Sequence, residues 1–262
     1  MRIALTIAGS DSGGGAGIQA DLKTFHQFGV FGTSVVTAVT AQNTRGVVAW
    51  EAVTPALVTA QLDAVAGDLR PGAVKSGMLA GRAIIDVVAD GLRRHALAPY
   101  VLDPVMVATS GDALADDGAA AAIAAQLLPL ATLVTPNLDE AERLTGRAVR
   151  DLGAMENAAR ELVTRGARAA LVKGGHLLGA DVADVLFDGH ESRVFRHPRL
   201  DSRNTHGTGC ALSAAITAQL ALGVELLPAV ERALAFVHAA IASAPGLGGG
   251  HGPLNLFSSA DR

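Results

Sequence analysis

The segment from Asn204 to Ser213 contains residues whose types and spacing suit the binding of an anion. It reads Asn-Thr-His-Gly-Thr-Gly-Cys-Ala-Leu-Ser, a glycine loop that runs directly into a helical pattern. Glycine lets backbone N–H groups approach a ligand without obstruction by a Cβ atom. The first turn of a helix has unpaired N–H groups at the positive end of its dipole. Gly207, Thr208 and Gly209 are therefore predicted to form an anion hole.

The only cysteine of the chain, Cys210, lies at the start of this predicted helix. A thiol at a helix N-terminus is expected to have a lowered pKa, although a bound polyphosphate would act in the opposite direction. We therefore expect a modestly acidic thiol that helps to accept the proton of an acceptor hydroxyl. The alternative interpretation is a small buried helix residue, because cysteine is often buried without a chemical role.

Polar side chains follow several of the short apolar runs in the chain. Asp103 ends one run, where it could form a turn before Pro104 or lie near a metal or a reacting phosphate, and Lys173 ends another. Asn137 and Glu140 are spaced as a helix capping box, but Glu140 also lies where Mg²⁺ and its water ligands would bind. Beside an anion hole, Lys173 could neutralise phosphate charge. Together these residues indicate phosphoryl transfer, which depends mainly on positioning and electrostatics.

The first glycine loop, residues 9–17, does not match a dinucleotide-binding motif, since no G-x-G-x-x-G fits residues 13–18. Asp21 follows this loop on a predicted helix. An acid there most often only complements the helix dipole, but Asp21 could instead face the loop and accept hydrogen bonds from a polar ligand. The sequence also lacks a P-loop, a nucleophile elbow and an H-E-x-x-H motif.

The elements that must position these residues alternate between short β-rich runs and longer amphipathic segments. This alternation predicts an α/β fold with a mostly parallel sheet and helices on both faces. A hairpin is expected around Asp188-Gly189, and the ligand site is expected beyond the carboxyl ends of the strands. One domain, 1–262, is predicted. The predicted strands are 3–7, 34–40, 74–76, 100–102, 133–135, 170–172, 184–187 and 193–196. The predicted helices are 17–28, 55–68, 82–95, 118–127, 139–145, 155–165, 210–222 and 227–243.

Composition narrows the class of protein further. The chain of 262 residues has a net charge of −4 and a pI near 6.0, which argue against nucleic acid as the main partner. One cysteine excludes a disulfide framework and a multi-cysteine metal site. No segment has the pattern of a targeting peptide or a membrane span. These features predict a cytoplasmic protein with no membrane partner.

Several blocks of the sequence resemble those of a known family. Residues 9–11 and 14–24 are similar to the N-terminal signature of the hydroxymethylpyrimidine (phosphate) kinases, the thiamin-pathway branch of the ribokinase superfamily. Gly13 stands where relatives often carry a serine. Later blocks are similar in the same order along the chain. These blocks are 40–44, 75–79, 101–106, 135–140, 173–176, 204–210 and 250–255.

The resemblance implies a three-layer α/β/α ribokinase-like fold, a homodimer, Mg-ATP as donor, and 4-amino-5-hydroxymethyl-2-methylpyrimidine and then its monophosphate as acceptors. It places Cys210 where sugar kinases of the wider superfamily carry an aspartate base, and it gives Glu140 to Mg²⁺ through water. The residues implied for the pyrimidine pocket are Gly9, Asp21, Gln42, Met78 and Val105. Those implied for ATP are Asp103, Asn137, Lys173 and Thr208.

Two alternatives to this function stay open in the sequence. A pyridoxal kinase of the same lineage is one, but Gln42 favours the pyrimidine, because a side-chain amide can pair with an aminopyrimidine edge. A catalytically silent ligand-binding domain of this fold is the other. It is conceivable because Leu234 stands where many relatives carry a lysine in the last long helix.

Overall fold

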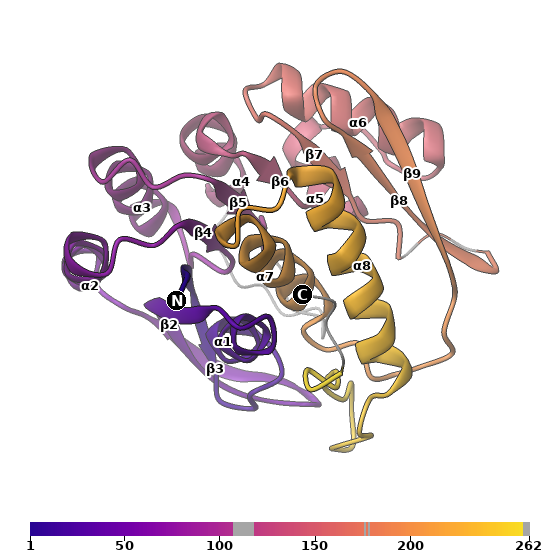
Figure 1. Cartoon of the computed structure of the whole chain (residues 1–262), viewed down its shortest axis with the longest axis horizontal. Helices are drawn as coiled ribbons and strands as arrows, with labels where there is room; N and C mark the ends of the chain where they lie inside the picture. Colours follow the sequence, from indigo (N-terminus) through magenta and orange to yellow (C-terminus); the bar gives the residue numbers. More distant parts are fainter. Residues whose placement is uncertain (107–117, 176, 178, 259–262) are drawn as a thin grey trace.

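The computed structural model describes residues 1–106, 118–175, 177 and 179–258 (Figure 1). Residue 176 of the 173–176 block and residues 107–117, 178 and 259–262 of the predicted domain lie outside this part. Within it, nine strands form one sheet in the order β3-β2-β1-β4-β5-β6-β7-β8-β9. The strands are β1 (Ile3–Asp11), β2 (Phe31–Asn43), β3 (Gly46–Ala52), β4 (Ala73–Ser76), β5 (Tyr100–Leu102), β6 (Leu133–Val134), β7 (Ala170–Val172), β8 (Asp181–Phe187) and β9 (Ser192–Pro198).

The sheet is mostly parallel, as the sequence predicts. The six strands from β2 to β7 in sheet order pair in parallel, whereas β3, β8 and β9 pair antiparallel. The hairpin expected around Asp188-Gly189 joins β8 to β9, with Phe187 opposite Ser192. The alternation of strands and helices therefore predicts the architecture correctly.

Helices cover both faces of the sheet, which gives the three layers of an α/β/α fold (Figure 1). Helices α2 to α6 pack in one core cluster, and α1, α7 and α8 pack in another. Strand β1 serves both, since Leu5 and Ile7 belong to the first cluster and Ala4 to the second. The helices are α1 (Gly17–Gln27), α2 (Pro55–Asp68), α3 (Arg82–Arg94), α4 (Ala119–Ala122), α5 (Leu138–Thr145), α6 (Leu152–Thr164), α7 (Thr208–Ala221) and α8 (Leu226–Ala242).

Two segments differ from the sequence prediction. Strand β3 was not predicted, although it pairs with β2 in a hairpin closed by Asn43 opposite Gly46. The predicted helix 118–127 is α-helical only in α4 and continues as a π-helical turn over Ile123–Leu127 and a 3₁₀ turn over Leu128–Leu130. Pro129 explains the second difference, because proline has no N–H and its ring displaces the preceding turn.

Helix α7 matters most for the position of the site. It contacts β1, β4 and β5 and carries many fully buried alanines, so it lies close to the sheet. Its N-terminus lies at the carboxyl edge of the parallel strands, where α/β sheets bind their ligands. The fold thus brings the first turn of α7 to the residues that follow the strands.

Candidate active site

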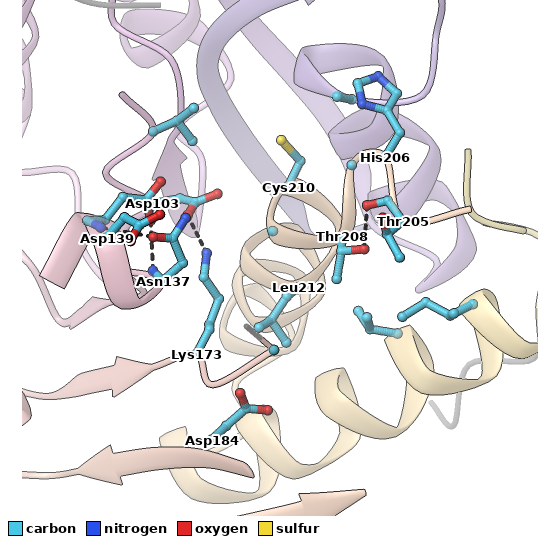
Figure 2. A pocket seen from close by; sticks show the side chains of 18 of the residues that line it. Asp103, Asn137, Asp139, Lys173, Asp184, Thr205, His206, Thr208, Cys210 and Leu212 are labelled. Atoms are coloured by element: carbon cyan, nitrogen blue, oxygen red, sulfur yellow. Dashed lines mark hydrogen bonds and ion pairs between the residues drawn. The ribbon is translucent and has the colours of Figure 1, made fainter. Parts of the chain in front are cut away.

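A cavity of about 880 Å³ lies at this edge of the sheet (Figure 2). Its volume is in the range of sites for small molecules and cofactors, about 300–1,000 Å³. Figure 2 shows Thr208 and Cys210 on the first turn of α7, with Lys173 and Asp103 on one side and His206 on the other. The predicted site residues that line the cavity are Gly9, Gln42, Met78, Asp103, Val105, Asn137, Glu140, Lys173, Gly207, Thr208, Gly209 and Cys210.

The predicted anion hole lies on the turn that begins α7. Gly207 is the N-cap residue and adopts a left-handed conformation with φ of 86°. A Cβ atom there would lie 1.9 Å from the carbonyl oxygen of Gly15, so glycine is required by contact as well as by conformation. The N–H and hydroxyl of Thr208 both donate to the carbonyl of Thr205, at 3.2 and 2.7 Å. The N–H groups that remain for an anion in this turn are those of Gly209 and Cys210.

Lys173 provides the positive charge next to this turn. Its Nζ atom lies 3.1 Å from Oδ1 of Asp103, which is almost fully buried. Thr135 and Ser213 also donate to Asp103, at 3.3 and 3.2 Å. A Cβ atom at Gly209 would lie 3.1 Å from Lys173 Nζ, so the ammonium group is adjacent to the anion hole. The arrangement places a fixed cation where phosphate charge would develop.

The position of Glu140 is compatible with both roles that its sequence context predicts, the helix cap and the contact with Mg²⁺. The capping box is present, because Asn137 Oδ1 accepts from the Glu140 N–H at 2.9 Å and Glu140 Oε2 accepts from the Asn137 N–H at 2.8 Å. The same carboxyl group lines the cavity. Burial raises the pKa of Glu140 to about 7, although the charge of Lys173 acts against this rise.

Replacing Glu140 by glutamine is expected to stabilise the protein at alkaline pH. The folded pKa of about 7 exceeds the ordinary 4.5, so the parent loses stability as pH rises between these values, when the unfolded state ionises first. Glutamine keeps an acceptor for the Asn137 N–H but carries no charge. Thermal unfolding should therefore give similar Tm values at pH 4.5 and a higher Tm for Glu140→Gln at pH 8.

The same variant separates the cap from a metal role. If Glu140 binds nucleotide-bound Mg²⁺, Glu140→Gln should lose activity that added Mg²⁺ partly restores. Unchanged activity at low Mg²⁺ would contradict the metal role and leave Glu140 as a helix cap.

The acidity of Cys210 differs from the prediction. Burial raises the pKa of the Cys210 thiol to about 12, and the charge of Lys75 only partly offsets this effect. The Gly17 N–H donates to the sulfur, so the N-termini of α1 and α7 meet at this side chain. The expectation of a modestly acidic thiol is therefore wrong, because desolvation outweighs the opposing effects of Lys75 and the Gly17 N–H. At neutral pH the thiol is protonated.

Asp21 is also placed differently from the prediction. It is fully buried and is not among the residues that line the cavity. Its Oδ1 atom accepts from Lys75 Nζ at 2.8 Å, and its Oδ2 atom accepts from the Thr6 hydroxyl at 2.6 Å. Asp21 is therefore paired inside the protein and does not lie at the helix surface, where the dipole interpretation placed it. The contact with the pyrimidine that the resemblance implies for Asp21 stays a prediction.

Two residues of the cavity had no role assigned from the sequence. Asp11 accepts from the N–H groups of Gly13, Gly15 and Ala16 and lies 2.9 Å from His206 Nε2. Although burial opposes it, His206 and these N–H groups hold the pKa of Asp11 below its usual value. Both residues occur within glycine-rich segments, but 195 positions separate them, so sequence spacing gives no sign of the pair.

Comparison with known proteins decides the family. The family model for phosphomethylpyrimidine kinase matches residues 11–255. The chain is 56% identical over 258 residues to a hydroxymethylpyrimidine/phosphomethylpyrimidine kinase of Rhizobium meliloti, covering 97% of both chains. The chain belongs to the phosphomethylpyrimidine kinase family.

Solved structures of pyridoxal kinases share the fold of this phosphomethylpyrimidine kinase family member. The ADP complex of Bacillus subtilis pyridoxal kinase is 37% identical, with a TM-score of 0.91 and 98% coverage of both chains. Staphylococcus aureus pyridoxal kinase in complex with AMP-PCP and pyridoxal is 32% identical, with a TM-score of 0.90, covering 98% of this chain and 94% of that one. The fold is thus ribokinase-like, as the resemblance implied.

One wall of the cavity is apolar in this phosphomethylpyrimidine kinase family member. Leu234, Val237 and Ile241 of α8 line it together with Leu212 of α7. Leu234 is almost fully buried, so an apolar side chain takes the position where many relatives carry a lysine. An apolar wall of this kind suits a planar base.

Two further observations bear on the predicted partners. Across residues 1–106, 118–175, 177 and 179–258, no helix is long and apolar enough to cross a membrane.

The same described residues contain no cluster of three or more His, Cys, Asp or Glu side chains that could hold a metal ion. A metal would therefore need ligands from the nucleotide, and two carboxylates, Asp103 and Glu140, line the cavity next to the anion hole. This donor set fits Mg²⁺, which is usually bound by one or two carboxylates with phosphates and water.

Proposed function

We propose that the chain is a kinase that uses ATP to phosphorylate 4-amino-5-hydroxymethyl-2-methylpyrimidine and then its monophosphate, in thiamin biosynthesis. One observation carries the proposal: a single cavity holds an anion hole, a buried Lys173–Asp103 pair and the polar end of Gln42. Relatives named hydroxymethylpyrimidine/phosphomethylpyrimidine kinase match nearly the whole chain. The nucleotide complexes of the pyridoxal kinases support ATP as the donor.

Each part of the cavity has a chemical task in this proposal. Lys173 would bind the transferring phosphoryl group, and the N–H groups of Gly209 and Cys210 would stabilise the charge that develops on it. Mg²⁺ carried by the nucleotide would neutralise phosphate charge, with Asp103 and Glu140 as the residues that hold it. The apolar wall of α8 would take the base.

The acceptor would bind at the other end of the cavity. Gly9, Met78 and Val105 line this end with apolar surface, and Gln42 lies at the end of β2. The Gln42 Oε1 atom accepts from Thr40 at 3.1 Å, which orients the amide. An oriented amide can both donate to and accept from an aminopyrimidine.

The test is a product-resolved assay of the purified chain with ATP and Mg²⁺. The pyrimidine alcohol should give the monophosphate and then the diphosphate, because one anion hole serves both steps. A diphosphate that never appears at high enzyme concentration would contradict the second step. No turnover of ATP with any acceptor would favour a silent binding domain.

Pyridoxal is the second candidate acceptor, and the two pyridoxal kinase structures favour it. Gln42→Met is expected to weaken use of the pyrimidine by about 1–3 kcal/mol, the scale of an unpaired buried polar group. Use of pyridoxal should hold or rise, because the proposed pairing of the Gln42 amide is with the aminopyrimidine and not with pyridoxal. The measurement is kcat/KM for both acceptors, and an equal loss for both would mean that Gln42 only shapes the loop.

The thiol of Cys210 is proposed to fill space beside the reacting phosphate rather than to take the proton. A general base contributes about 10²–10⁴-fold, but a protonated thiol with a pKa of about 12 cannot act as one at neutral pH. Cys210→Ala should therefore keep kcat within about tenfold of the parent, with Cys210→Ser as the isosteric control. A loss above about 10²-fold in both variants would return Cys210 to the role of base.

A cytoplasmic homodimer is also part of the proposal. A single free cysteine suits a reducing compartment. Strands β2 and β3 carry exposed apolar side chains, with Phe31 at 51%, Val39 at 55% and Val48 at 81% exposure. Exposed apolar side chains on one edge of a sheet support an interface there. Light scattering of the purified chain measures the oligomeric state directly.

A further inference from the structure

A buried ion pair lies behind the anion hole, and the proposed mechanism gives it no task. Lys75 of β4 and Asp21 of α1 are both 0% exposed, and Lys75 Nζ lies 2.8 Å from Asp21 Oδ1. Thr6 donates to the second carboxylate oxygen at 2.6 Å, so Asp21 accepts on both oxygens as an ionised carboxylate does. Replacing a buried pair by apolar residues is often neutral or stabilising, so stability alone is a weak reason for this one.

The position of the ammonium group relates the pair to the site. Helix α7 packs on β4 and β1, the strands that carry Lys75 and Thr6. Lys75 Nζ lies 3.8 Å from the place that a Cβ atom would take at Gly77, the residue after β4. The side chain therefore extends toward the carboxyl edge of the sheet, where the cavity lies, although Lys75 itself does not line the cavity.

The charges around the first turn of α7 show which end of the pair faces it. After burial, Lys75 has the largest effect on the pKa of the Cys210 thiol, and it lowers that pKa, whereas Asp21 and Asp103 raise it less. The titratable groups that face Lys75 are Asp21 from α1, Cys210 from α7 and Asp103 after β5. The ammonium group of Lys75 thus acts on Cys210 more strongly than the carboxylate of Asp21 does.

We propose that Lys75 is a positioning residue for phosphoryl transfer: its ammonium group, fixed by Asp21, places a buried positive charge beneath the first turn of α7 and strengthens the anion hole there. The inference rests on the kinase activity proposed above. In a site with little water, a fixed charge of this kind acts without reorganisation when negative charge develops. Lys75 acts through the turn of Gly209 and Cys210 and does not touch the substrate.

The test is the double variant Lys75→Met with Asp21→Asn. It removes both charges of the pair, so no uncompensated charge stays buried. We expect kcat to fall by about 10²-fold, while ADP affinity and Tm stay close to those of the parent. The control is Thr6→Val, which removes a hydrogen bond to Asp21 but no charge, and its kcat should stay within about threefold. A folded double variant with kcat within about threefold of the parent overturns the proposal.

A second variant covers the case in which the double variant fails to fold. In Asp21→Asn, burial of an unpaired ammonium should lower the pKa of Lys75. The kcat of this variant should then fall as pH rises through the new pKa, at a pH where the parent is still active. A ratio of variant to parent kcat that is constant with pH means a structural role and overturns the proposal.

The readouts also separate this inference from the proposed function. Transfer to the pyrimidine alcohol and slow transfer to water are measured for each variant. If the parent protein transfers phosphate to water but not to the pyrimidine, the proposed acceptor is wrong. Equal transfer to water by the parent and the folded double variant contradicts the role of Lys75 alone.

Discussion

Gly207→Ala should abolish most of the activity, with kcat/KM lower by at least about 10²–10³-fold, the effect of losing an oxyanion-hole donor. The added methyl group would lie 1.9 Å from the Gly15 carbonyl oxygen, and backbone on both sides prevents a simple side-chain adjustment. The loop or the start of α7 must then move, and the N–H groups of Gly209 and Cys210 move with it. Steady-state kinetics with ATP and the pyrimidine alcohol measures the loss.

Gly223→Ala is the matched control for this variant. Gly223 follows the other end of α7 with φ of 88°, almost the value of Gly207, but a Cβ atom there meets nothing within 4 Å. The control therefore carries the same conformational cost, about 1–2 kcal/mol, without the contact. Its Tm should fall while kcat/KM is retained. A Gly207→Ala variant with activity like that of Gly223→Ala would contradict the anion hole.

Lys173→Met is expected to lower kcat by about 10²–10³-fold, because it removes the cation that lies next to the anion hole. The loss should be in kcat more than in ATP affinity if Lys173 acts on charge that develops in the transition state. The variant also leaves Asp103 buried without its partner, so Tm should fall as well. Pre-steady-state measurement of the first turnover, together with Kd for ADP, separates these effects.

Ser213→Ala provides the comparison for Lys173→Met. Ser213 donates to Asp103 Oδ2 at 3.2 Å, so its loss disturbs the same carboxylate but keeps the charge pair. Its kcat should stay within about threefold of the parent. If both variants lose activity equally, Asp103 orientation rather than the Lys173 charge is the important property.

Much of the site follows from local sequence, because residues after parallel strands must meet at one edge of the sheet. Asp103, Asn137 and Lys173 each follow a strand that periodicity predicts, and all three line the cavity. The capping box of Asn137 and Glu140 is equally local, since it depends on a spacing of three residues. Strand β3 was missed because a short edge hairpin has little burial to give it a pattern.

The remaining features depend on contacts between distant segments and on burial. The partner of Asp21 is Lys75, 54 positions away, and nothing near Asp21 indicates that a strand lysine will be buried beside it. The prediction for the pKa of Cys210 is wrong for the same reason. Its helix position predicts a lower pKa, but partial burial of the thiol in the fold raises the pKa instead.

The contacts of His206 and His251 have a consequence for cleavage of the chain by a protease. The His206 N–H donates to the Gly252 carbonyl at 3.1 Å, and the His251 N–H donates to that of Thr44 at 2.7 Å. Segments that lie far apart in the sequence therefore meet at one place. Every strand of the described sheet ends by Pro198, so a chain without residues 251–252 would keep these strands but lose both hydrogen bonds. Loss of this C-terminal stretch to a protease would silence the enzyme while leaving most of its core intact.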